Sequence, residues 1–329
     1  MNYSEDYISN FGKQTGFINS NIEKVIRLLD ILAFINSDLD PYHEKLVLKG
    51  GTAINLIITN LARLSVDIDL DYIGGLDKEK MSVDRDAIMS ALDNFMSKEG
   101  YAVSPEKSRG SVILASRTYS YTNAFGNRDN IKVEINFIDR IHVCPCIRKK
   151  VKYFDKEVMV QTPLEAELLG MKIAALIDRH KPRDLFDIYK LKGYMPYLDK
   201  DKVRKLAVFY LSLDGIFELN EATFDNVNKI AQDSIKKELQ PVLTKGNMFD
   251  LNVAKEEVIK FLKDLLVLTD NENKYLIEFS KGNFDPYLLF EPNDAERAAK
   301  HPMAKWRVAK LVRIDNYKGW KSGSKRNYL

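Results

Sequence analysis

The segment that most constrains the fold runs from residue 45 to residue 73 and reads KLVLKGGTAINLIITNLARLSVDIDLDYI. It begins with a short apolar run at 45–49, turns at a glycine pair and continues as a helical stretch to about residue 61. Residues 66–73 then alternate polar and apolar side chains, which is the period of a strand. The segment therefore predicts a strand, a turn, a helix and a second strand, with a polar row on one face of the second strand.

Three aspartates, Asp67, Asp69 and Asp71, occupy every second position of that second strand. Residues two apart project from the same face and lie roughly 6.5–7 Å apart at the backbone. Carboxylates at that spacing repel unless a cation lies between them, and divalent ions prefer such oxygen ligands. Paired divalent ions promote in-line displacement at phosphorus. Glu134, on the polar face of a later predicted strand at 130–139, offers a third carboxylate.

The glycine pair, Gly50 and Gly51, lies between the first strand and the helix, followed by the hydroxyl of Thr52. Free backbone N–H groups and the helix dipole at such a turn favour a phosphate. Each feature alone has an ordinary interpretation: a glycine pair is usually a turn, two aspartates on a strand are usually a solvated edge, and a glutamate is usually surface. The three together, in this order, favour a site for a metal ion and a nucleotide.

The remaining sequence predicts an α+β fold in which an all-helical part follows a sheet flanked by helices. A Thr-Pro-Leu-Glu capping box at 162–165 predicts a strong helix start, and the helical period continues to about residue 312. We therefore expect two domains, residues 1–160 and 161–329, and a mobile basic tail at 318–329. The other predicted helices are 18–38 and 78–99, and the other predicted strands are 111–122 and 156–162.

Composition places few further limits on function. The 329 residues are 45% hydrophobic and 29% charged, as in ordinary globular proteins. The net charge of +3 neither requires nor excludes nucleic acid. No secretory signal or bilayer-spanning run is visible, so we expect a cytoplasmic protein without a membrane partner. His142, Cys144 and Cys146 lack a second ligand cluster, and we interpret the cysteines as reduced structural thiols.

At this level of detail the chain resembles the nucleotidyltransferase superfamily, and within it the AbiEii/AbiGii-type toxins of type IV toxin–antitoxin and abortive-infection systems. The resemblance includes an R-x-S-x-D-h-D pattern formed by Arg63, Ser65, Asp67 and Asp69. A second block at 164–191 resembles the helix pair of that family. It contains the further residues that the resemblance adds to the nucleotide site, namely Lys172, Lys181, Asp184 and Asp187.

The resemblance implies that Asp67, Asp69 and Glu134 hold Mg²⁺ or Mn²⁺, that Lys172 contacts the phosphates of an NTP, and that Asp187 has a catalytic or orienting role. Asp71 is not needed by the motif, and we expect it at the rim of the site or in solvent. On this basis Asp69→Ala and Lys172→Ala should fold normally and lose nucleotide transfer.

The resemblance also implies that the acceptor is the 3′ end of tRNA, that the enzyme blocks translation as a toxin, and that a cognate antitoxin exists. Two other acceptors remain open, a protein and a small molecule, as do a non-catalytic nucleotide-binding regulator and an RNA-binding structural protein. Basic segments that suit RNA phosphates are residues 149–152, 235–240 and 300–313.

Overall fold

The computed structural model describes residues 2–323. Its centre is a six-stranded mixed sheet in which β2 and β6 are parallel and every other neighbouring pair is antiparallel. The predicted α+β class is therefore confirmed. The main path of the sheet runs β1 (Leu46–Lys49), β2 (Asp67–Tyr72), β6 (Arg128–Asn136), β5 (Leu114–Thr122) and β3 (Ala102–Val103), and β4 (Arg109–Gly110) pairs with β5 from outside this path.

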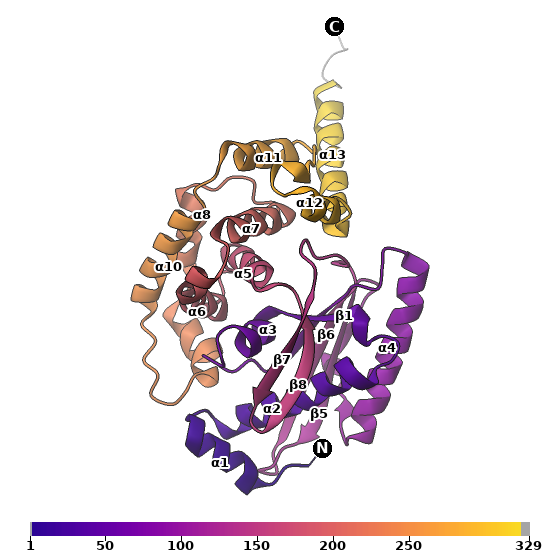
Figure 1. The fold of residues 1–329 in the computed structure, drawn as a ribbon, viewed down its shortest axis with the longest axis vertical. Helices are drawn as coiled ribbons and strands as arrows, with labels where there is room; N and C mark the ends of the chain where they lie inside the picture. The colour runs from indigo at the N-terminus through magenta and orange to yellow at the C-terminus, as the bar shows by residue number, and fades with distance from the viewer. Residues whose placement is uncertain (1, 324–329) are drawn as a thin grey trace.

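Four helices belong to the N-terminal part: α1 (Glu5–Thr15), α2 (Asn19–Ala33), α3 (Gly50–Ile57) and α4 (Lys78–Lys98). The apolar face predicted for α2 is buried, and α4 lies beside the sheet (Figure 1). Helix α3 ends four residues earlier than predicted, because Asn60 and Leu61 adopt left-handed backbone angles of 50° and 55° in φ. The chain thus leaves the helix early and returns to the sheet as β2.

A separate two-stranded sheet, β7 (Ile147–Tyr153) and β8 (Lys156–Thr162), packs against α2 and β1. Strand β8 has the predicted bounds, whereas β7 was not predicted because its lysines interrupt the apolar alternation. The predicted capping box is wrong. Thr162 is the last residue of β8, and α5 begins at Glu165 without a side-chain cap.

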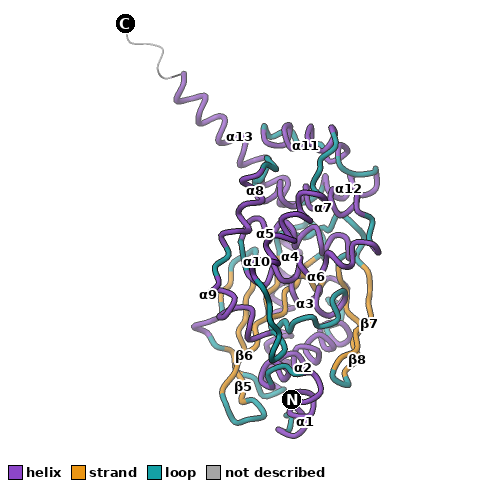
Figure 2. The backbone as a smooth tube through the Cα atoms, turned by 90° about the vertical axis from the view of Figure 1, so that its left-hand side faces the viewer, coloured by secondary structure: helices purple, strands orange, loops and turns teal. Residues whose placement is uncertain are grey.

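The rest of the described chain is helical, as predicted, and contains no strand after Thr162 up to residue 323. These helices lie at one end of the main sheet, and α13 extends away from the body (Figures 1 and 2). The last six residues of the predicted basic tail lie outside the described residues. The helices are α5 (Glu165–Arg179), α6 (Pro182–Leu191), α7 (Lys200–Asp214), α8 (Glu221–Asp225), α9 (Gln232–Ser234), α10 (Leu251–Leu265), α11 (Asp270–Ser280), α12 (Pro292–Ala299) and α13 (Pro302–Gly323).

One hydrophobic cluster joins the sheet and the helical part, since its members include Ile8 from α1, Ile68 from β2 and Phe209 from α7. Helix α5 connects the two parts, because it packs against α3 on one side and α7 on the other. Helix α3, which also packs against β1 and β2, therefore lies between the sheet and the helical part. Among residues 2–323, every helix is too short or too polar to form a membrane span.

Candidate active site

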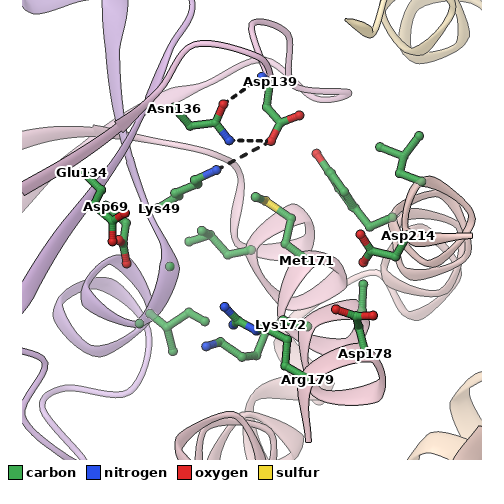
Figure 3. A pocket seen from close by; sticks show the side chains of 18 of the residues that line it. Lys49, Asp69, Glu134, Asn136, Asp139, Met171, Lys172, Asp178, Arg179 and Asp214 are labelled. Atoms are coloured by element: carbon green, nitrogen blue, oxygen red, sulfur yellow. Dashed lines mark hydrogen bonds and ion pairs between the residues drawn. The ribbon is translucent and has the colours of Figure 1, made fainter. Parts of the chain in front are cut away.

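A cavity of about 420 Å³ lies where the carboxylate strands and the start of α3 meet helices α5 and α7. The N-terminal part lines one wall and the helical part lines the other (Figure 3). The site is therefore built from segments far apart in the sequence. Its charged and polar side chains are those of Lys49, Asp69, Glu134, Asn136, Asp139, Lys172, Asp178, Arg179, Tyr210 and Asp214.

Two carboxylates of the predicted site, Asp69 and Glu134, lie side by side in this cavity. They are register partners on the parallel strands β2 and β6, and both line the wall (Figure 3). Burial raises the pKa of Asp69, and the charges of Asp67 and Glu134 raise it further, while Lys49 opposes them. Asp67 lies two residues earlier on β2, outside the cavity lining. A cation between these carboxylates would remove the repulsion that raises this pKa.

The donor set suits a hard divalent ion because it consists of carboxylate oxygens that repel one another. Within residues 2–323, the side chains as placed bring no three His, Cys, Asp or Glu residues close enough to hold a metal ion, so the metal triad of Asp67, Asp69 and Glu134 stays a prediction. Glu134 instead forms an ion pair with Lys132. Asp69 and Glu134 thus fit as ligands, provided that Glu134 exchanges Lys132 for the ion.

The glycine turn lies directly against Asp69, one member of this carboxylate pair. Gly50 has φ +71°, and a Cβ at this position would lie 2.8 Å from the Asp69 carboxylate. A Cβ on Gly51 would lie 2.7 Å from the Arg63 guanidinium. Only glycine allows both the left-handed backbone and this close approach. The first N–H groups of α3 are consequently held beside Asp69, at the cavity wall.

Thr52 anchors the glycine turn to the start of β2. Its side chain is 1% exposed, and its hydroxyl donates to the backbone carbonyl of Asp67 at 2.5 Å. The Ser65 hydroxyl lies 3.0 Å away from it. These contacts fix α3 to the start of β2. Thr52 and Ser65 therefore support the wall in this structure and do not line the cavity.

Lys172 lines the cavity and is held by two aspartates of α6. Its Nζ lies 2.8 Å from Asp184 and 3.1 Å from Asp187. Arg63 forks onto Asp187 with two hydrogen bonds of 2.8 Å, and Arg179 reaches Asp184 at 3.2 Å. Burial alone would raise the pKa of Asp187, but Arg63 and Lys172 lower it. Burial would likewise lower the pKa of Lys172, and the two aspartates raise it, so the lysine is charged.

The structure does not bring Lys181, also predicted at the site, to the cavity. Its side chain is 56% exposed and lies 3.9 Å from Glu238 on the surface. Asp184, Asp187 and Arg63 form a buried layer behind Lys172. Their geometry suits orienting Lys172.

Lys49 is a cavity residue that the sequence analysis missed, although it directly precedes the glycine pair. It is the register partner of Asp69 on β1, and its ammonium lies 2.5 Å from Asp71 and 3.8 Å from Asp139 (Figure 3). The prediction that Asp71 is a rim or solvated residue is wrong. Asp71 is 0% exposed, because the loop after β6 covers its face and places His142 3.3 Å from it.

A buried chain of charges continues from Asp71 to the opposite cavity wall. His142 lies between Asp71 and Glu167, which is 3.6 Å from its Nδ1, and Tyr210 donates to Glu167 at 2.5 Å. Burial opposes protonation of His142, but the two carboxylates raise its pKa to about 9. Both cysteines near it are free thiols, with Cys144 buried. This chain links β2 to α5 and α7 within the site.

The helical wall of the cavity is acidic. Asp178 and Asp214 lie there, across the cavity from Asp139 and Lys49 (Figure 3). Burial raises the pKa of Asp214 to about 6, and the charge of Asp178 contributes to the shift. No sequence pattern indicated this wall, because Asp178 and Asp214 come from two different helices, α5 and α7.

A strand, a glycine turn and a helix that lead into a carboxylate strand, beside a parallel strand with a further carboxylate, define a nucleotidyltransferase. The chain belongs to the AbiEii family, because the family model described as nucleotidyl transferase AbiEii toxin, type IV TA system, matches residues 34–271. It is a nucleotidyltransferase of a toxin family.

The structure is similar to that of MenT4, a nucleotidyltransferase toxin from Mycobacterium tuberculosis H37Rv, with a TM-score of 0.60. The two sequences are 16% identical, and the match covers 94% of this chain and 99% of MenT4. This likeness shows that the two proteins have the same fold. No curated protein sequence matches the chain significantly.

Proposed function

We propose that the protein is a Mg²⁺-dependent enzyme that transfers NMP from an NTP to the 3′-terminal hydroxyl of tRNA and thereby acts as a cytoplasmic, translation-blocking toxin. The observation that carries this proposal is the arrangement of Asp69 and Glu134, the glycine turn and Lys172 around one cavity. Carboxylates, backbone N–H groups and an ammonium are the groups that phosphoryl transfer requires.

The ion would be held by Asp69 and Glu134, with Asp67 as the third ligand, and would neutralise charge on the α-phosphate. The N–H groups of residues 50–52 at the start of α3 bind the triphosphate, and the ammonium of Lys172 neutralises its charge. Asp187 and Asp184 orient Lys172, and Arg63 and Ser65 keep the turn in position. Glu134 has a second role open to it, that of accepting the proton of the attacking hydroxyl. Lys181, whose side chain is 56% exposed, contributes by approaching the bound nucleotide from the surface.

The acceptor proposal rests on exposed basic residues and on the family to which the chain belongs. Exposed lysines that suit RNA phosphates include Lys236, Lys237, Lys305 and Lys310. MenT4 is described as a nucleotidyltransferase toxin, and the family description names a type IV system. By that relationship the chain would have a cognate antitoxin.

Incubation with each α-labelled NTP, Mg²⁺, total tRNA and total protein tests the acceptor. The proposal predicts label in RNA at the 3′ end, removable by 3′-exonuclease. Label in protein or in a small molecule would replace tRNA with one of the alternative acceptors. Nucleotide binding without any labelled product would identify a non-catalytic regulator.

A further inference from the structure

A second pocket, of about 320 Å³, lies away from the catalytic cavity and is strongly basic. It forms where the loops after the parallel strands β2 and β6 meet the end of α12, and we call it the basic pocket. No carboxylate is among its lining residues. They are Ile73, Gly75, Leu76, Arg140, Ile141, His142, Cys146, Arg297 and Lys300.

Its arginines are held rigidly by backbone carbonyls. Arg140, only 9% exposed, donates from Nη1 to the carbonyl of Leu76 at 3.1 Å. Arg297 donates from Nε to the carbonyls of His142 and Val143 at 3.0 and 3.1 Å. A preordered guanidinium loses little freedom on binding, and its planar fork suits a phosphate.

The cationic groups of the pocket are not neutralised within the described chain. Neither arginine forms an ion pair with a carboxylate in residues 2–323, and the buried Nε of Arg140 has no hydrogen-bond partner there. Lys300, exposed at the end of α12, adds a third positive charge. A buried donor without a partner is costly, so an oxyanion at this place would satisfy it.

His142 does not add to this excess charge, because Asp71 and Glu167 balance it from behind. The C-terminal end of α12, the negative end of its dipole, also meets the pocket, and Arg297 in the last turn and Lys300 at the C-cap offset that charge. The net field in the pocket is therefore that of the remaining basic side chains.

We propose that the basic pocket binds a phosphate group, at a site separate from the nucleotide cavity. The ligand is a phosphomonoester or inorganic phosphate, which the pocket volume accommodates. The carrier of this group is a free nucleotide or the end of an RNA chain.

Equilibrium dialysis of the full chain with labelled inorganic phosphate, without divalent cation, tests the proposal. Wild type should bind one phosphate per chain, and Lys300→Glu and Arg140→Gln should each bind at least tenfold more weakly. Lys274→Glu is the matched control, since Lys274 is an exposed lysine of α11 that does not line the pocket. It should bind as wild type does, and circular dichroism should show that all variants are folded.

Two results would overturn the proposal: no phosphate bound by wild type, or unchanged binding by Lys300→Glu in a folded protein, because Lys300 lines the basic pocket and not the catalytic cavity. Competition by AMP or by a 5′-phosphorylated oligoribonucleotide then identifies the carrier, and either result supports the site.

Discussion

At the residue scale, the charged side chains near the cavity are held in position, and kept ionised, by buried partners of opposite charge. Lys172 lies between Asp184 and Asp187, and Asp187 also accepts both arms of Arg63. Such a cluster is stable only while its charges balance, because removing one partner leaves an uncompensated buried charge. The same residues that orient the lysine therefore also contribute to folding.

Lys172→Ala should consequently be less stable than wild type, which revises the expectation from sequence that it folds normally. We expect a loss of about 2–3 kcal/mol in the free energy of unfolding, since Arg63 and Arg179 still pair with the two aspartates. Urea denaturation measures this loss. Lys260→Ala, a lysine on the exposed side of α10, is the control, and equal stability of both variants would contradict the buried network.

His142 should make stability depend on pH. Its folded-state pKa of about 9 lies above the value of 6.5 for a free histidine, so its stabilising contribution is complete below pH 6.5 and is lost as the pH rises through 9. The shift corresponds to about 3 kcal/mol. Unfolding of wild type and His142→Asn at pH 6 and pH 9.5 measures it. The difference between them should shrink at the higher pH, and a difference independent of pH would contradict this ionisation.

At the element scale, the turn between β1 and α3 combines two requirements on one glycine. Gly50 needs a left-handed backbone, and its Cα must approach Asp69 closely. Gly126, in the turn between β5 and β6, has a similar φ of +76° but nothing within 4 Å of an added Cβ. Alanine at Gly126 therefore tests backbone strain alone, whereas alanine at Gly50 tests strain together with contact with the Asp69 carboxylate.

Gly50→Ala and Gly126→Ala should each lose about 1 kcal/mol of stability from the backbone. Only Gly50→Ala should also lose nucleotide transfer, about 10-fold or more, because its methyl group displaces the Asp69 carboxylate. Thermal unfolding and transfer rates measure both effects. Equal activity of the two variants would show that the turn does not position Asp69.

Local pattern predicted most of these elements. Strands β2, β6 and β8 and helices α2 and α4 follow from alternation or amphipathic period, since each has one buried face. Strand β7 was not predicted because lysines interrupt its apolar alternation. The early end of α3 was not predicted because it depends on two residues with left-handed backbone angles, which the apolar sequence does not indicate. Alternation correctly placed Asp71 on the polar face of the strand. It did not predict that Asp71 is buried, because the burial depends on His142 in the loop after β6.

At the scale of the whole molecule, the site exists only where two parts of the chain meet. Asp69 and Glu134 come from the first 160 residues, whereas Lys172 and Tyr210 come from the helical part. Sequence patterns identified members of each half, but Lys49, Asp139 and the acidic wall required the three-dimensional structure. The hydrophobic periodicity of a segment does not indicate which distant segments line the same cavity.

We therefore propose that residues 1–160 and 161–329 form one cooperative unit, joined by the Arg63–Asp187 pair and a shared core. Both tryptophans, Trp306 and Trp320, are in the helical part, so their fluorescence reports on that part alone, while circular dichroism reports on the whole chain. The two signals should give one urea midpoint. Two separate midpoints would show that the parts unfold independently.

The most direct test of the catalytic account is the initial rate of α-phosphate label transfer from NTP to tRNA with Mg²⁺, compared among wild type, Asp69→Asn and Asp77→Asn. Asp77 is an exposed N-cap residue of α4 in the loop after β2, and the same change of charge there keeps a good cap. Asp69→Asn should be slower by about 100-fold or more, with Asp77→Asn near wild type. Transfer by Asp69→Asn at the wild-type rate would contradict the assignment of this strand as the catalytic centre.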